Sequence, residues 1–302
     1  MRILGIGDAD IDIYIEVEEV PKYDEKIFSK STSKNVGGMV LNFLSCLNSL
    51  GNECEFVGLI GDDDYGKIIL NFLKKFKIDS KNVIVDKLGE TYYCYVILDK
   101  LGEKLLIIVP TNCIFIDEKM VKEEFFRKKT HVHTTSGDLD TAKKVLHLAK
   151  KNNVSVSIDI ENIYDFELLS GMLKNVDILF LNKKTFQNLG FKKINDGLAN
   201  IIKYGPKMIC LTKGRDGSVT FTNGKIFSHN AFRVGVKDTT GAGDCFAAGF
   251  IHGFVRNWSI ERTTIFANAV ASLSTTKIGG SSFRKSESEV NYFIISQKKY
   301  NV

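Results

Sequence analysis

Several features that would assign this chain to other classes of protein are missing from its sequence. The six cysteines include no Cys-x-x-Cys pair and no regular spacing, which argues against a disulfide framework and predicts buried free thiols. No apolar run approaches the roughly 18 residues of a membrane span, and the opening residues MRILGIGDAD are not typical of a signal peptide. We therefore expect a cytoplasmic protein with no membrane partner.

Prolines and basic clusters are also scarce. The 302 residues include three prolines, and we find no low-complexity linker or internal repeat, so a single domain over residues 1–302 is the simplest prediction. Lys and Arg number 41 against 36 Asp and Glu, but no basic cluster alternates with aromatic side chains. That pattern is typical of a solvated lysine-rich surface and argues against nucleic-acid binding.

Two common nucleotide-binding motifs are absent as well. The stretch GIGDAD from Gly5 has Asp10 where a dinucleotide fingerprint needs its third glycine, which argues against a nicotinamide oxidoreductase. The chain contains no G-x-x-x-x-G-K-[ST] run, which excludes a Walker-type NTPase.

Short apolar runs alternate with helical patterns along most of the chain. Strands are expected from Arg2, Cys54, Val154, Asp177 and Met208, and helices from Val40, Gly66, Thr141 and Gly197. Such alternation predicts a parallel sheet covered by helices on both faces, an α/β fold. From Gly243 onward the pattern is mostly helical.

Two segments interrupt this alternation, because strand pattern follows strand pattern without a helix. They are residues 11–36 and residues 91–110, the second with a hairpin turn at DKLGEK. Together they predict a small separate sheet that closes a site as a lid or pairs with a second subunit as a homodimer.

The stretch DTTGAGDCFAAGF, from Asp238, combines close glycines with an acidic residue before an apolar helix. Gly241, Ala242 and Gly243 have little or no side chain, so backbone N–H groups at the positive end of the helix can approach a phosphate. From the residues alone, Asp244 is either a helix cap or a general base.

The spacing of these motifs resembles that of the ribokinase-like (PfkB) carbohydrate kinase family. The family motif D-T-x-G-A-G-D is matched from Asp238 to Asp244, and the motif G-G-x-x-x-N is matched by Gly37, Gly38 and Asn42. Weaker matches, GIGDADIDIY, GLIGDDDYG, LTKGRDG and FANAVASLSTTKIGG, extend the resemblance over nearly the whole chain. The resemblance implies a three-layer α/β/α Rossmann-like sandwich with a mostly parallel central sheet and a small β lid.

The resemblance also implies an ATP-dependent kinase that transfers the γ-phosphoryl group to a hydroxyl of a sugar or related polyol, with Mg2+. Asp244 is implied as general base, and the N–H groups of Ala242, Gly243 and Asp244, after Gly241, are implied as the anion hole. Three further sets are implied: Asp10, Asp12, Gly38 and Asn42 for the acceptor; Asn182, Thr212, Gly214, Gly217 and Asn268 for ATP; Asp238, Thr240, Ser274, Lys277 and Gly279 for a K+ site.

The chain departs from the family pattern at two positions. Thr185 stands where the family has a glutamate that organises the magnesium waters, which predicts weaker magnesium handling or another carboxylate in that role. Met39 replaces a lysine of the ribokinases proper, which counts against ribose and favours a bulkier acceptor. A nucleoside kinase for adenosine, inosine or pseudouridine is therefore the first alternative, and a nucleotide-binding regulator with little transfer activity is the second.

Three other groups of residues have competing interpretations. His131 and His133 share one face of a strand without metal-ligand spacing, so we predict a structural role. The run from Asp62 to Asp64 is typical of a helix cap. The tyrosines Tyr92, Tyr93 and Tyr95 could stack on a substrate or form dimer contacts.

Overall fold

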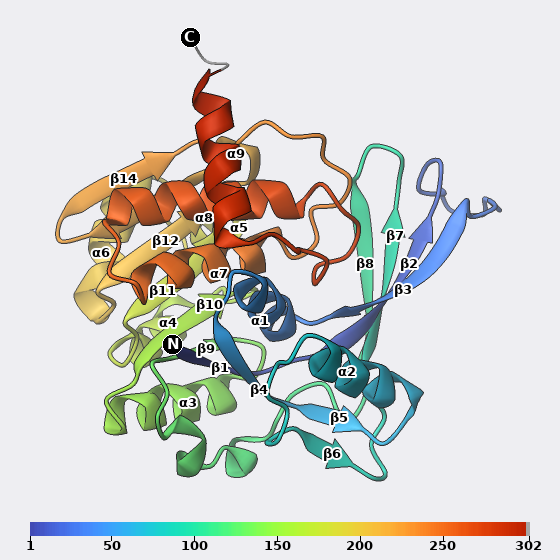
Figure 1. Ribbon diagram of the computed structural model, residues 1–302, viewed down its shortest axis with the longest axis horizontal. Helices are drawn as coiled ribbons and strands as arrows, with labels where there is room; N and C mark the ends of the chain where they lie inside the picture. The colour runs from blue at the N-terminus through green and yellow to red at the C-terminus, as the bar shows by residue number, and fades with distance from the viewer. Residues whose placement is uncertain (300–302) are drawn as a thin grey trace.

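A large sheet runs through the centre of the molecule (Figure 1). The computed structural model describes residues 1–299, and its eight-stranded sheet has the order β14-β13-β12-β11-β10-β9-β1-β4. The pairs from β4 to β12 are parallel, whereas β12, β13 and β14 pair antiparallel. Its strands are β1 (Arg2–Ile6), β4 (Glu53–Val57), β9 (His131–Thr135), β10 (Ser155–Ile160), β11 (Ile178–Asn182), β12 (Met208–Thr212), β13 (Ser218–Thr222) and β14 (Lys225–His229).

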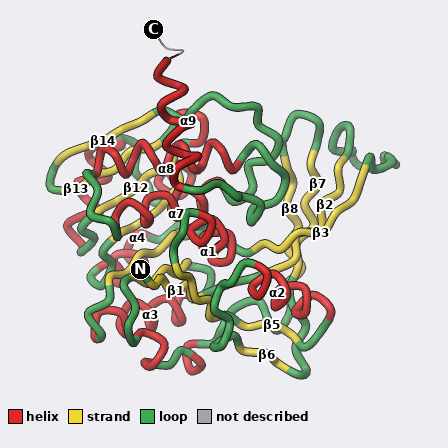
Figure 2. The backbone as a smooth tube through the Cα atoms, in the orientation of Figure 1, coloured by secondary structure: helices red, strands yellow, loops and turns green. Residues whose placement is uncertain are grey.

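Helices cover both faces of this sheet and form the outer two layers (Figures 1 and 2). One face carries α1 (Met39–Ser49), α7 (Ala242–Phe254) and α8 (Ile260–Ser274), with α9 (Glu287–Lys299) packed against α8. The other face carries α3 (Leu139–Lys151), α4 (Phe166–Leu173), α5 (Lys183–Asn188) and α6 (Ile194–Ile201). The three-layer α/β/α prediction is therefore confirmed.

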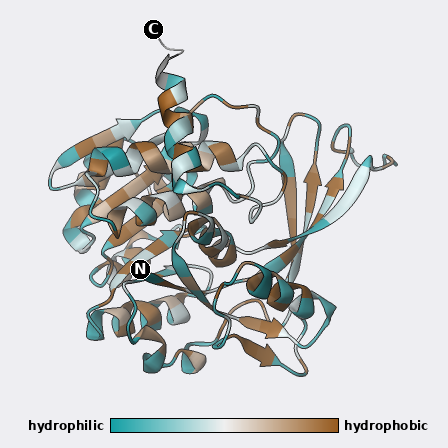
Figure 3. Cartoon of the chain, in the orientation of Figure 1, coloured by the Kyte–Doolittle hydropathy of each residue, from teal (hydrophilic) through white to brown (hydrophobic). Residues whose placement is uncertain are grey.

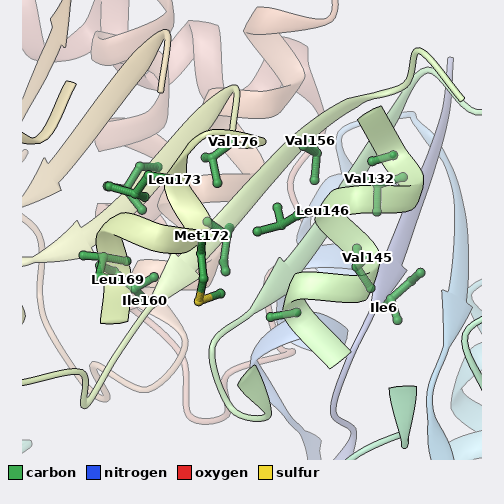
Figure 4. Packing of buried hydrophobic residues seen from close by; sticks show 14 of the residues in the cluster. Ile6, Val132, Val145, Leu146, Val156, Ile160, Leu169, Met172, Leu173 and Val176 are labelled. Atoms are coloured by element: carbon green, nitrogen blue, oxygen red, sulfur yellow. The ribbon is translucent and has the colours of Figure 1, made fainter. Parts of the chain in front are cut away.

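Alternating side chains on the central strands explain why the sheet has two apolar faces. On β1, Leu4 and Ile6 belong to the cluster on the α3 side (Figure 4), whereas Ile3 belongs to the cluster on the α1 side. Gly5 faces α1, where a Cβ atom would lie 2.7 Å from side-chain atoms of Val40. Hydrophobic residues accordingly follow the central strands, whereas α2 (Asp64–Lys75) carries both hydrophilic and hydrophobic residues (Figure 3).

The two irregular segments form the separate sheet that the sequence predicts. Its order is β3-β2-β7-β8, built from β2 (Asp10–Glu16), β3 (Ser31–Gly37), β7 (Tyr93–Leu98) and β8 (Lys104–Val109). We call this sheet the lid. It stands beside the large sheet rather than on either of its faces (Figure 1).

One predicted strand is divided in two. The apolar run from Cys54 is interrupted at Gly58, and the chain continues as β5 (Leu59–Gly61), which pairs with β6 (Ile84–Asp86) outside the large sheet. A Cβ atom at Gly58 would lie 2.5 Å from the carbonyl oxygen of Gly7, so the turn there requires glycine. The predicted cap of α2 is confirmed, since Asp63 accepts a hydrogen bond from the Gly66 N–H at 2.7 Å.

Within residues 1–299, no helix is both long and apolar enough to cross a membrane.

Candidate active site

A cavity of about 830 Å³ lies where the lid meets the carboxyl end of the large sheet. Its walls come from the start of β2, the start of α1, the inner face of β7 and β8, the end of β10 and the start of α7. Ligands of open α/β sheets bind at this edge. Of the predicted site residues, the cavity brings together Asp10, Asp12, Gly38, Asn42, Thr240, Gly241, Ala242, Gly243 and Asp244.

The start of α7 is fixed by close backbone packing. Gly241 has φ +73°, and a Cβ atom there would lie 2.6 Å from the Cα of Gly280. Only glycine adopts this conformation at such close range without strain. The helix therefore begins at Ala242, whose N–H donates to the Thr239 carbonyl at 3.3 Å. The next two N–H groups, of Gly243 and Asp244, have no hydrogen-bond partner among residues 1–299 and belong to residues that line the cavity.

Asp244 faces the cavity and does not cap its own helix. Its carboxylate accepts a hydrogen bond from the Asn42 side-chain amide at 2.9 Å, and the residue is only 8% exposed. No backbone N–H of α7 donates to this side chain in the described chain. Burial raises the pKa of Asp244 well above its ordinary value, while the Asn42 hydrogen bond acts in the opposite direction.

The two aspartates of β2 lie on the lid side of the cavity. Burial raises the pKa of Asp12 to about 7, and the nearby Asp238 carboxylate adds to the effect. Burial likewise raises the pKa of Asp10, with the charges of Asp12 and Asp8 as further causes. The Oδ1 atoms of Asp10 and Asn42 are buried without a hydrogen-bond partner among residues 1–299. Hydroxyl groups of a bound molecule are suitable donors for such atoms.

Asp8 is a site residue that the sequence did not single out. Its carboxylate accepts hydrogen bonds from the N–H groups of Met39 and Val40, at 2.9 and 3.2 Å, and from the Tyr92 hydroxyl at 2.9 Å. Asp8 thereby caps α1 across a long sequence separation and holds Tyr92 in the cavity wall. The sequence signal for Asp8 is its position two residues before Asp10, in the same run of alternating aspartates.

Two more acidic residues, Asp159 and Glu161, reach the cavity from the end of β10. Burial raises the pKa of Asp159 to about 8. Glu161 is exposed to the cavity and accepts a 3.4 Å hydrogen bond from the side-chain amide of Asn182. The run IDIE at a strand end repeats the spacing of Asp10 and Asp12, so the sequence contained a signal for both residues.

The residues predicted to hold ATP do not line the cavity but continue from it along the same sheet edge. Asn182 and Thr212 end adjacent strands and pair in register. Gly214 and Gly217 form the following turn, where a Cβ at Gly217 would lie 2.0 Å from the His229 carbonyl oxygen. Asn268, on α8, is buried and donates to the Ser218 hydroxyl at 2.7 Å.

Thr185 occupies a different environment from these residues. It is 3% exposed in the first turn of α5, and its side chain does not line the cavity. Its backbone N–H donates to Asn182 Oδ1 at 2.8 Å. Thr185 therefore positions Asn182 through the helix cap and offers no group to the cavity.

Asp238, one of the predicted K+ ligands, already accepts four hydrogen bonds. Its Oδ2 accepts from the Tyr14 hydroxyl and the Gly279 N–H, both at 2.9 Å. Its Oδ1 accepts from the backbone N–H and hydroxyl of Thr240, at 2.8 and 2.6 Å. The backbone carbonyls of Ser274 and Gly279 each accept a backbone N–H, so the K+ site stays a prediction.

The histidines have the structural role that the sequence predicts. His131 hydrogen-bonds Ser155 and Ser157, and His133 bonds Ser157, all within the sheet core. Burial lowers the pKa of both rings to about 3. Nowhere in the described chain do three or more His, Cys, Asp or Glu side chains gather as a metal cluster.

A mostly parallel sheet with a lid and an acidic cavity at a glycine-rich helix start is the arrangement of ribokinase-like phosphotransferases, which act on an alcohol group. Residues 2–286 match the pfkB family carbohydrate kinases. The chain belongs to this family, and it is a phosphotransferase with an alcohol group as acceptor.

Comparison with individual proteins supports the same assignment. The chain is 27% identical over 283 residues to an ATP-dependent ribose-1-phosphate kinase of Halopiger xanaduensis, covering 93% of this chain and 94% of that protein. A nucleoside kinase of Methanocaldococcus jannaschii is 27% identical over 281 residues, covering 90% and 89%. The structure of Arabidopsis thaliana ribokinase complexed with ribose and ATP matches with a TM-score of 0.83 and 28% identity, covering 97% and 98% of the two chains.

Asp12 should make the stability of the unliganded protein depend on pH. Its pKa is about 7 in the folded chain, against roughly 3.9 for an unfolded aspartate. The folded state thus retains the proton longer, and stability present below about pH 4 is lost as the pH rises through 7. We expect Asp12→Asn to be more stable than the wild type at pH 8 by roughly 1 to 3 kcal/mol in urea unfolding.

The other buried carboxyls act in the same direction, so the substitution should reduce the pH dependence without removing it. Asp64→Asn, at an exposed position on α2, is the control and should leave the profile unchanged. Equal pH profiles for Asp12→Asn and the wild type would show that folding does not raise the pKa of Asp12.

Proposed function

We propose that this chain is an ATP-dependent kinase that transfers the γ-phosphoryl group to a hydroxyl of a sugar or related polyol. One observation carries the proposal: Asp244, Asp10 and Asp12 of β2, and the first turn of α7 with its unpaired N–H groups line the same cavity. A carboxylate with a raised pKa accepts a proton readily, and the N–H groups stabilise negative charge beside it.

The transfer step follows from this placement. The acceptor oxygen forms a bond to the γ-phosphorus, the bond from that phosphorus to the ADP oxygen breaks, and the hydroxyl proton passes to Asp244. The unpaired N–H groups of Gly243 and Asp244, next to Ala242 in the first turn of α7, stabilise the phosphoryl oxygens. Asn42 keeps the Asp244 carboxylate aimed at the hydroxyl through its 2.9 Å hydrogen bond.

The acceptor is held by buried oxygen atoms. The unpartnered Oδ1 atoms of Asp10 and Asn42 accept hydrogen bonds from acceptor hydroxyls, with Asp12 beside them. Gly38 has φ +95°, and a Cβ there would lie 2.6 Å from the Cα of Ala9, so the start of α1 lies directly against the β2 entrance.

The nucleotide extends along the sheet edge from the cavity, past Asn182, Thr212, Gly214 and Gly217 toward Asn268 on α8. Bound Mg2+ would supply positive charge that offsets the charge of the phosphates. The group that fits it is the exposed Glu161 carboxylate, a hard oxygen ligand that accepts a hydrogen bond from the Asn182 amide nitrogen at this edge. Glu161 supplies the negative charge that a glutamate supplies in the family. Thr185, at the position of that glutamate, is uncharged and lies outside the cavity.

The candidate K+ site is unchanged and consists of Asp238, Thr240, Ser274, Lys277 and Gly279.

Asp244→Asn tests the general base. An ADP-release assay with Mg2+ and K+ should find turnover on one member of a panel of sugars, phosphosugars and nucleosides. The variant should lower kcat on that acceptor by about 100- to 10,000-fold, because the hydroxyl proton loses its acceptor, while ATP binding by calorimetry persists. Asp64→Asn, far from the cavity, is the control and should keep full activity.

The same panel separates the alternatives. A nucleoside with a far higher kcat/KM than any free sugar would establish the nucleoside kinase, which the similarity to the Methanocaldococcus nucleoside kinase favours. ATP binding without turnover on any acceptor would instead support a nucleotide-binding regulator. Full activity of Asp244→Asn would refute the assigned base.

Glu161→Gln tests the magnesium assignment. Loss of the carboxylate should raise the Mg2+ concentration needed for half-maximal activity by roughly 10-fold or more. Paramagnetic resonance of Mn2+ in the presence of ATP should show a matching loss of metal affinity, independently of turnover. Glu167→Gln, exposed on α4, is the control. Unchanged Mn2+ affinity in Glu161→Gln would remove Glu161 from the metal site.

We also propose that the lid forms a homodimer through its outer face. Ile13, Ile15, Tyr95, Ile97, Leu105 and Ile107 alternate with the cavity-facing residues and lie in register across three strands. Leu105 and Ile107 are 42% and 47% exposed, and β8 is an unpaired edge. A second copy of the chain would cover both the apolar face and the edge.

Ile107→Lys should convert a dimer into a monomer in light scattering after gel filtration, because it places a charge in the apolar face. Val85→Lys, at another exposed apolar position, should leave the mass unchanged. A wild-type chain that is monomeric at micromolar concentration would contradict the proposed dimer.

A further inference from the structure

Lys104 brings a positive charge into the cavity from the lid. It is the first residue of β8, and its side chain lies on the inner face of the lid, in register with Leu98. Its Nζ donates a hydrogen bond to the Thr240 hydroxyl at 2.9 Å. Thr240 immediately precedes Gly241, where the glycine-rich turn begins, so the ammonium lies at the entrance to the anion hole.

Lys104 is the only basic side chain lining the cavity in the described part of the chain. The acidic residues that line the same cavity are Asp8, Asp10, Asp12, Asp159, Glu161, Asp165 and Asp244. The ammonium is partly buried, and burial lowers its pKa, whereas the nearby charges of Asp238, Asp244, Asp12 and Glu161 act against that shift. A lone cation among so many carboxylates would usually be held by one of them in an ion pair.

The lysine forms no such pair. Its one described hydrogen bond goes to a neutral hydroxyl, which itself donates to Asp238 at 2.6 Å. No carboxylate oxygen of residues 1–299 lies within ion-pair distance of Nζ. An ammonium has three N–H donors, so two of them remain available to a ligand in the cavity.

We propose that Lys104 is a catalytic residue whose ammonium contacts the γ-phosphoryl group during its transfer. This role rests on the proposed kinase function. The transferring group spreads its negative charge over three equatorial oxygens. The N–H groups of α7 contact these oxygens on one side, and the ammonium, adjoining Thr240, contacts them on the side of the lid.

The placement also makes the position of the ammonium depend on the lid. The anion hole lies at the edge of the large sheet, whereas Lys104 is part of β8 and moves with the lid. Two contacts join the inner face of the lid to the turn at the start of α7: Lys104 with Thr240, and Tyr14 with Asp238 at 2.9 Å. The cation is therefore in place only while the lid strands lie against this turn, which couples lid closure over the acceptor to phosphoryl transfer.

Lys104→Met removes the charge while keeping most of the side-chain volume. We expect kcat to fall by roughly 100- to 1,000-fold, the effect of losing one preorganised donor to a transition state. The KM for the acceptor and the affinity for ATP should change by less than about threefold, because the contact strengthens only during transfer. Lys100→Met, in the same hairpin but exposed and paired with Glu18, is the matched control and should retain full activity.

Two further measurements distinguish this role from a structural one. Binding of ADP with aluminium fluoride, which mimics the transferring phosphoryl group, should weaken in Lys104→Met by a factor similar to the loss in kcat. Lys104→Arg should keep more activity than Lys104→Met. In Lys104→Ala, added propylammonium should restore part of kcat in a saturable manner.

The outcomes separate this inference from the function on which it rests. If the wild type turns over no acceptor, the proposed kinase function fails, and the role of Lys104 fails with it. If the wild type is active and Lys104→Met keeps kcat within threefold, only the role of Lys104 is refuted. A loss confined to KM, without weaker binding of the aluminium fluoride complex, would also refute it.

Discussion

The buried carboxylate of Asp238 holds together the parts from which the site is built. Its two oxygens accept hydrogen bonds from the lid through Tyr14, from the turn before α7 through Thr240, and from the segment after α8 through Gly279. These three segments are distant in sequence and meet at a residue that is 1% exposed. A buried carboxylate is costly unless its acceptors are satisfied, so the three segments are stable only in this mutual arrangement. The direction of α7, and with it the position of the N–H groups in its first turn, depends on that arrangement.

The site concentrates negative charge where folding alone would avoid it. Burial raises the pKa values of Asp10, Asp12, Asp159 and Asp244, which means that the ionised forms are disfavoured in the folded chain. In the proposed function, the hydroxyl groups of the acceptor, the cation and the Lys104 ammonium would each offset part of this cost. A site that lowers the stability of the folded chain in this way is a trade between stability and function expected at active sites.

At two positions the chain lacks a charged residue of the family pattern, and in each case a nearby residue can supply that charge. Thr185 lacks the carboxylate of the family motif, and Glu161 of the adjacent strand hydrogen-bonds to the same Asn182 side chain. Met39 lacks the lysine of the ribokinases proper, and Lys104 of the lid enters the same cavity. In each case the charge that the family residue carries is present in the cavity on a different element of the fold. This is consistent with a site whose charged residues have changed position, and not with a site that has lost them.

The sequence by itself determined the fold class, the lid and the start of α7, because each depends on patterns within a short stretch. Strand and helix periods predicted the three layers, strand following strand predicted the lid, and the glycines around Ala242 marked the start of a helix. Only the tertiary structure showed that Asp244 bonds to Asn42 instead of capping its helix, and that Lys104 reaches Thr240. Those contacts depend on strand register and on the docking of the lid, which join residues far apart in the chain, and no local period of the sequence encodes them.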